Sequence, residues 1–406
     1  MNLKENLQVC SSKNLRQKKK KEEPATKEDS KQKQQTTATT SLQISNNGEK
    51  KSALKPRNLY AEMNQNPRAE SESRLKKKSL DGIETPSFKL LTESEDDDII
   101  LTPWNAIVVN HKSELTQMEK EISTFMYCFA DAPEVVVFSC MSGKLLNRNE
   151  IASLLHQTDL SNSVIDCWSA ILNMEAKLYT KHKATRYMFP ASILIEDMLD
   201  LRAYKEETYV KFREKIVHQT TCDDIDYKFS EVEMVFFPVF VSGLNFLLCF
   251  NLTSSDIDII DHSYLDMPTD EKYGLAPDGL KYLFPSYLGE FKHIKSDLLT
   301  KSEPKRKVFK WRSNEMDPAY GVLTMRYMET YVSGDSWDCY LEDEGQERDI
   351  QIEKLRKKYA AKIIISDINI IKDDVLKEMH CFHSAYTDTE KEQLMDSARR
   401  RYTENK

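Results

Sequence analysis

The stretch NEMDPAYGVLTMRYMETY, residues 314–331, decides the fold. It predicts a helix that begins just after Pro318, because Asp317 is a favoured N-cap residue and proline suits the first helical position. Three apolar residues then recur at helical spacing and predict a face that packs into a core: Val322, Met325 and Met328.

Apolar runs that precede this helix predict a small sheet. Residues 235–241 and 246–250 are rich in aromatic and β-branched side chains and have the length of strands. Residues 256–261 alternate polar and apolar side chains and predict a third strand, and residues 307–311 predict a short fourth one. Near-continuous apolar runs are typical of strands that are covered on both faces.

Helices are expected on both sides of these strands along the chain. The clearest follows residues 159–163, which offer N-cap side chains, and one face carries its apolar residues: Val164, Ile165, Trp168, Ile171 and Leu172. Other expected elements are a strand at 134–138 and helices near 191–201, 207–217, 277–291, 350–365 and 373–382. Helices, then a small sheet, then helices predict an α+β fold, with a central sheet flanked by helices.

The first 97 residues differ in composition from the rest of the chain. Up to the first aromatic residue, Tyr60, there are 14 Lys and Arg against 6 Asp and Glu. Such a segment cannot bury enough apolar surface to offset its ordering entropy, so we expect a disordered basic tail at 1–97. The folded domain should span residues 98–383, with its motifs within 164–369, and residues 384–406 should form a polar tail.

Two basic clusters, residues 16–21 and 74–78, lie in the expected tail. They predict a nuclear import signal or weak contact with nucleic acid, with a solvated tail as the alternative. We therefore expect a nuclear protein, or otherwise a cytoplasmic one. No apolar run reaches the roughly 18 residues that cross a bilayer, and we expect no secretory signal at the N-terminus.

The eight cysteines are scattered and form no Cys-x-x-Cys pair. This spacing argues against zinc and favours a reduced, intracellular protein, so we expect no metal and no cofactor. His380 and His383 have i, i+3 spacing, but two ligands without a third are a weak metal signal. Cys249 with His262, or Cys339 after Asp338, offers a displaced reactive pair, although burial in the core is the favoured role for both thiols.

The ordered set of motifs resembles the SUMO-specific, ubiquitin-like-protein proteases, which are cysteine proteases of the adenain type. Gly321 and Val322 match the family's nucleophile motif, Gln-x-Asn-x-x-Asp-Cys-Gly-Val, and residues 309–311 resemble the strand before its glutamine. Plant members of this family often have a similar sequence along the nucleophile helix. The resemblance covers about half of the chain, and it implies a cysteine-protease-like domain with a mixed sheet. The implied activity is proteolysis at a SUMO or other ubiquitin-like C-terminus, with that protein as the partner.

The resemblance also assigns catalytic positions, most of which this chain has lost. Asp261 matches the family's acid, whereas Leu244 stands at the histidine position and Asn245 at the tryptophan that follows it. Asn314 stands at the glutamine position and Tyr320 at that of the nucleophilic cysteine. A thiol protease needs a thiolate and a base, so we expect no thiol-protease activity.

Tyr320 places a ring where the resemblance puts a substrate glycine, and we expect it to plug that channel. Three functions then remain open. The chain is an inactive pseudoprotease that still binds a ubiquitin-like protein, an active cysteine peptidase with a non-standard nucleophile, or a decayed, transposon-associated copy.

Overall fold

The computed structural model describes residues 107–128, 135–156, 160–179, 185–200, 206–241, 243–263, 267–309, 319–334, 337–343 and 345–404. All of them belong to the second of two compact units, Leu80–Lys406. The expected tail at 1–97, both basic clusters and Asn314 lie outside the described residues. Within the described residues, no helix is both long and apolar enough to span a bilayer.

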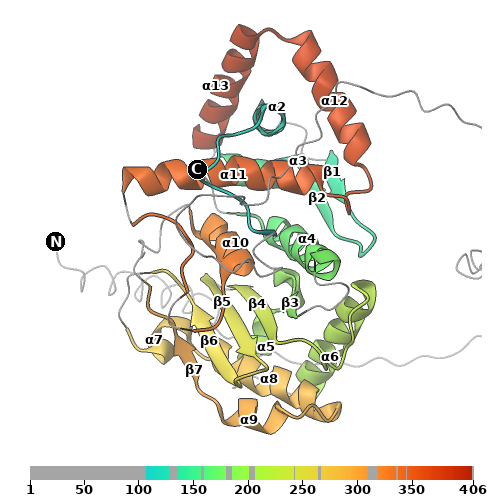
Figure 1. Cartoon of the computed structure of the whole chain (residues 1–406), viewed down its shortest axis with the longest axis vertical. Helices are drawn as coiled ribbons and strands as arrows, with labels where there is room; N and C mark the ends of the chain where they lie inside the picture. The colour runs from blue at the N-terminus through green and yellow to red at the C-terminus, as the bar shows by residue number, and fades with distance from the viewer. Residues whose placement is uncertain are drawn as a thin grey trace, which may run out of the picture. The chain divides into compact units, whose positions relative to one another are not determined.

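The described elements are helices and short strands (Figure 1). The strands are β1 (Val136–Ser139), β2 (Leu145–Asn147), β3 (Arg186–Met188), β4 (Met234–Val241), β5 (Leu244–Asn251), β6 (Asp256–Ile260) and β7 (Pro304–Arg306). The helices before β7 are α2 (Gln117–Cys128), α3 (Arg148–Leu155), α4 (Asn162–Tyr179), η2 (Ala191–Ile193), α5 (Glu196–Leu199), α6 (Glu206–Cys222), α7 (Thr269–Tyr273), α8 (Ala276–Glu290) and α9 (Ser296–Lys301). The helices after it are α10 (Tyr320–Thr330), α11 (Gln346–Ile365), α12 (Lys372–Ala385) and α13 (Asp388–Glu404).

A mixed five-stranded sheet has the order β3-β4-β5-β6-β7. Strands β4, β5 and β6 pair antiparallel, while β3 and β7 pair parallel at the two edges. Pro238 lies within β4, where it cannot donate a ladder hydrogen bond. Strand β3 pairs with β4 only from Met234 to Phe236, so among the described strands Pro238 has a neighbour on one side alone.

Helices cover both faces of this sheet, as the apolar runs predict. On one face, Phe236, Leu247 and Cys249 join a buried cluster that also contains residues of α4, α10 and α11. On the other face, Phe237 and Phe250 pack against Phe284 of α8, with ring centroids 5.2 and 4.9 Å apart. The predicted α+β fold with a central sheet between helices is therefore confirmed.

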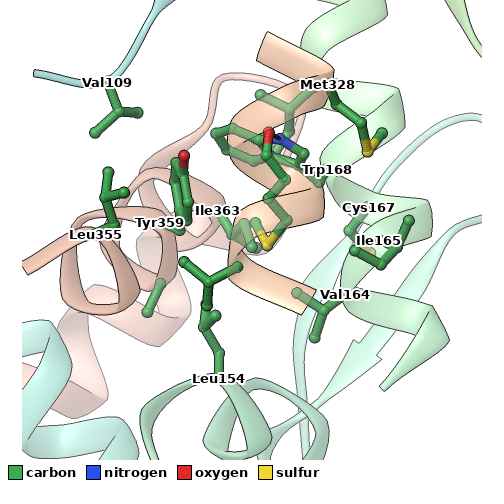
Figure 2. Close-up of a cluster of buried hydrophobic side chains, with 14 of the residues drawn as sticks. Val109, Leu154, Val164, Ile165, Cys167, Trp168, Met328, Leu355, Tyr359 and Ile363 are labelled. Carbon is green, nitrogen blue, oxygen red and sulfur yellow. Dashed lines mark hydrogen bonds between the residues drawn. The ribbon is translucent and has the colours of Figure 1, made fainter. Parts of the chain in front are cut away.

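Helices α4, α10 and α11 share one core (Figure 2). All five apolar residues predicted for one face of α4 are buried. Trp168 stacks at a tilt on Tyr359 of α11, with ring centroids 4.7 Å apart, and its indole N–H donates to the carbonyl of Met325 at 3.2 Å. Because this single side chain contacts both other helices, it fixes α10 against α4 and α11.

A buried ion pair also holds α10. Arg326 and Glu329 lie one turn apart at 2.6 Å, with side chains 2% and 0% exposed. Glu329 accepts hydrogen bonds from the amide of Val109 at 3.1 Å and the hydroxyl of Tyr359 at 2.7 Å. Arg326 donates to the carbonyls of Val109 and Cys339, both within 2.9 Å. The pair thereby ties four separate parts of the chain together.

Two predicted elements differ from the structure. The helix expected at 191–201 is divided into η2 and α5, because the backbone between them is extended, with ψ of 142° at Leu194 and 157° at Ile195. Of the strand expected at 307–311, residues 310 and 311 lie outside the described residues and 307–309 are not in a strand. The edge strand is instead Pro304–Arg306, which pairs with β6. Val308, which belongs to the apolar pattern, is 75% exposed.

The C-terminal region contains a helix where a polar tail is expected. Helix α13 contacts α2, and its Ala398 is buried. The predicted boundaries at residues 97 and 383 stay predictions.

His111 makes the stability of the domain depend on pH. Burial, followed by the Arg326 guanidinium 3.1 Å away, lowers the pKa of His111 from 6.5 to about 3. Between these two pH values His111 is protonated in the unfolded chain but neutral in the folded chain. The free energy of unfolding should therefore fall as the pH falls below 6.5. The loss should approach about 1.4 kcal/mol per pH unit within that window.

Substituting His111→Gln should reduce this pH dependence, since the amide oxygen still accepts from Arg326 but does not titrate. Urea unfolding at several pH values between 4 and 7 measures the slope. His380→Gln, on the exposed side of α12, is the matched control and should keep the wild-type slope. Equal slopes for His111→Gln and the wild type would contradict the assignment.

Candidate functional site

The candidate site lies at one end of the central sheet. Strand β5 begins at Leu244 and its antiparallel neighbour β6 ends at Ile260, so Leu244 and Asp261 occupy the same end. Helix α10 begins at Tyr320, whose hydroxyl reaches this end of the sheet. The fold thus brings together three of the four positions assigned from the sequence. Asn314, like the side chain of Leu244, lies outside the described part of the chain.

Asp261 is a buried carboxylate with many donors around it; the residue is 3% exposed. Its contacts are with the hydroxyl of Tyr273 at 2.5 Å, the ammonium of Lys272 at 2.9 Å, the amide of Ser263 at 3.0 Å, the hydroxyl of Ser263 at 3.2 Å and the guanidinium of Arg306 at 3.8 Å. Burial by itself raises the pKa of the Asp261 carboxyl. The hydrogen bonds from Tyr273, Lys272 and their neighbours outweigh it and lower that pKa to about 2.

Tyr320, at the start of α10, adds a further hydrogen-bond donor to Asp261. Its hydroxyl donates to Oδ1 of Asp261 at 2.7 Å and also lies against the backbone carbonyl of Asn245. Burial and the negative charge of Asp261 raise the pKa of the Tyr320 phenol well above its ordinary value. The phenol is therefore neutral at physiological pH, and it acts as a hydrogen-bond donor rather than as a nucleophile.

Gly321 allows α10 to begin close to the segment that precedes α4. A Cβ atom added at Gly321 would lie only 2.4 Å from the Cβ of Leu160, far inside van der Waals contact. Any side chain here would push the start of α10, and with it Tyr320, away from the sheet. The glycine of the nucleophile-like motif thus has a packing role in this chain.

His262, the candidate for a displaced base, lies beside the tyrosine. Its buried ring is 4.2 Å from the ring of Tyr320 and 5.7 Å from that of Tyr327, measured between centroids. The hydroxyl of Tyr320 is already bonded to Asp261, so the contact with His262 is one of ring packing.

The two thiols singled out from the sequence are both buried. Burial raises the pKa of Cys249 well above its usual value and that of Cys339 to about 12, so neither exists as a thiolate near pH 7. Trp337, two residues before Cys339, packs against Tyr327 and Tyr331 with ring centroids 5.4 and 4.8 Å apart. Both thiols therefore serve packing, the role favoured from the sequence.

Several residues that contact Asp261 were not predicted from the sequence. Lys272 and Tyr273 lie on α7, and Arg306 lies on β7, so their meeting at Asp261 depends on long-range packing. Ser263 alone carried a local signal, since Asp side chains often accept from the amide two residues on. Among the described residues, no group of three or more His, Cys, Asp or Glu side chains is arranged to hold a metal ion.

Comparison with known proteins gives no family and no curated relative: no family model and no curated protein matches the chain. Solved structures of SUMO proteases resemble it at low identity. SUMO protease Ulp1 with its catalytic cysteine oxidized to a sulfenic acid is 11% identical, with 66% of this chain and 99% of that chain covered and a TM-score of 0.42.

Two further solved structures give similar values. The C-terminal Ulp1 protease domain in complex with Smt3, the yeast ortholog of SUMO, is 10% identical, with 63% and 98% of the two chains covered and a TM-score of 0.43. The Ulp1-like SUMO protease catalytic domain of Chaetomium thermophilum is 13% identical, with 65% and 95% covered and a TM-score of 0.43. Likenesses of this size establish neither a family nor an activity.

The bond between Tyr320 and Asp261 should contribute measurably to stability. Tyr320→Phe keeps the ring but removes the donor, and the free energy of unfolding should fall by about 1.5–3 kcal/mol, as for other hydrogen bonds to a charged group. Urea denaturation measures the change, with Tyr340→Phe, at an exposed tyrosine, as the matched control. If Tyr320→Phe is as stable as the wild type, the hydroxyl does not anchor α10 to the sheet.

Proposed function

We propose that this chain is a non-catalytic member of the SUMO-specific, ubiquitin-like-protein protease family, which binds SUMO or another ubiquitin-like protein without cleaving it. The observation that carries this proposal is the hydrogen bond from Tyr320 to Asp261. The ordered sequence motifs support the family, and this bond supports the loss of chemistry.

The chemistry fails at three points. A phenol with a raised pKa stands at the position of the thiolate nucleophile. Leu244, whose side chain has no titratable group, stands at the position of the base. The remaining acid, Asp261, would normally orient a histidine, but here it is bonded to Tyr320, Tyr273 and Lys272. Of the catalytic positions that the resemblance assigns, those in the described part of the chain supply neither a thiolate nor a histidine base.

Tyr320 also changes how a partner would bind. The phenol and the carbonyl of Asn245 meet where the family resemblance puts the C-terminal glycine of the substrate. In this proposal the folded part of the ubiquitin-like protein binds, while its C-terminal tail is kept out of the site. The basic clusters at 16–21 and 74–78 favour a nuclear location for this binding.

Reaction with a warhead tests the chemistry. SUMO and ubiquitin that carry a C-terminal vinyl sulfone should form no adduct with the wild-type chain. The triple variant Leu244→His, Asn314→Gln, Tyr320→Cys should gain an adduct, because a thiol and a base then stand beside Asp261. Its matched control, Leu244→His with Asn314→Gln, keeps the tyrosine and should stay unreactive.

Binding of the unmodified partner completes the experiment. Titration calorimetry of the wild-type chain with SUMO and with ubiquitin should give saturable binding to at least one of them. A wild-type adduct that disappears in Cys249→Ala or Asp261→Ala would overturn the proposal in favour of a peptidase with a non-standard nucleophile. Neither adduct nor binding would indicate a decayed copy.

A further inference from the structure

A cavity of about 340 Å³ lies among α2, α3, α11 and α13, and no residue of the Tyr320 site lines it. In Figure 1, α2 and α13 lie beside α11, and α2 contacts both of these helices. The volume is near the lower end of the roughly 300–1,000 Å³ that is usual for small-molecule sites. It therefore suits a compact ligand of one ring and a polar group.

The wall of the cavity is positively charged. Among the described residues that line it, four are cations, Lys120, Arg356, Lys357 and Arg399, and one is a carboxylate, Glu353, which pairs with Lys357 at 2.8 Å. Arg399 also pairs with Asp396, which lies one turn away on α13, at 3.5 Å. The whole chain carries a net charge of −8, so the charge around this cavity has the opposite sign to the net charge of the chain. A concave wall with one sign of charge attracts ligands of the opposite sign.

Arg356 is buried and held by a hydrogen bond within the protein. The residue is 3% exposed, and its guanidinium donates to the carbonyl of Leu154, near the C-terminal end of α3, at 2.8 Å. A guanidinium that is held by its own structure loses little conformational entropy when an anion binds. Lys120 and Arg399, in contrast, are exposed and lie at the rim of the cavity.

The rest of the wall is apolar or aromatic. Leu115, Leu155 and Met395 line it, and the ring of Tyr127 stacks on that of His156 at a centroid distance of 3.8 Å. Burial, as the main cause, lowers the pKa of His156 to about 4, so its imidazole is neutral near pH 7 and adds an aromatic face rather than charge. An inorganic anion would leave these apolar surfaces in contact with water.

We propose that this cavity binds a small aromatic phosphate monoester, with the phosphate beside Arg356, Lys120 and Arg399 and the ring against the apolar wall. Planar guanidinium groups bind phosphate oxygens in pairs, which favours a phosphate over a single-charge ligand. The cavity shares no residue with the bond between Tyr320 and Asp261, so a test of this ligand site does not depend on whether the proposed function is correct.

Titration of the full chain with phenyl phosphate tests the site, with calorimetry and amide chemical shifts as readouts. Phenyl phosphate should bind saturably, more tightly than inorganic phosphate and more tightly than benzyl alcohol. The affinity should fall as the salt concentration rises, because the cations at the rim are exposed. The shifts should be confined to α2, α3, α11 and α13.

The double variant Lys120→Gln, Arg399→Gln should weaken phenyl phosphate binding about tenfold, since each exposed charge contributes up to roughly fivefold. Both side chains are exposed, so the fold should be unchanged, and urea denaturation checks this. Lys301→Gln with Lys305→Gln removes two exposed cations from α9 and β7, and it should bind like the wild type. Absence of saturable binding at millimolar ligand would overturn the proposal, as would equal affinity for inorganic phosphate or an unchanged affinity in the double variant.

Discussion

The buried ion pair between Arg326 and Glu329 is the constraint on which the rest of this domain depends. Two charges that are withdrawn from water cost several kcal/mol each unless other hydrogen bonds satisfy them. Here the backbone of Val109, the carbonyl of Cys339 and the hydroxyl of Tyr359 do so. Because these partners come from distant parts of the chain, α10 can occupy its position only when all of them have assembled.

The position of α10 in turn decides the chemistry at the end of the sheet. Trp168 and Gly321 let the helix approach closely, and Tyr320 then reaches Asp261. A cysteine at the same position would be too short to make this bond and would need a histidine between itself and the acid. The tyrosine spans that distance alone, so the carboxylate of Asp261 anchors the helix to the sheet.

The site at Asp261 and the cavity beside α13 differ in the kind of electrostatics that they offer. Asp261 is surrounded by donors that hold its pKa at about 2, so its charge is already compensated within the protein. Among the described residues that line the cavity, cations outnumber carboxylates four to one, although Lys357 pairs with Glu353 and Arg399 with Asp396. A local excess of cations favours an anionic ligand from solution, whereas a compensated charge favours the fold itself.

The sequence by itself determined the elements whose apolar side chains repeat at the period of a helix or a strand. The face of α4, the stripe of α10 and strands β4 to β6 could be predicted because burial of such patterns is favourable in any arrangement of the domain. The family resemblance also singled out Asp261 and Tyr320. Only the tertiary structure decided that these two residues bond directly, that Lys272 and Tyr273 join them, and that the described residues 191–200 and 307–309 depart from their local patterns. The contacts at Asp261 join residues far apart in the chain, and such contacts leave no periodic pattern in the sequence.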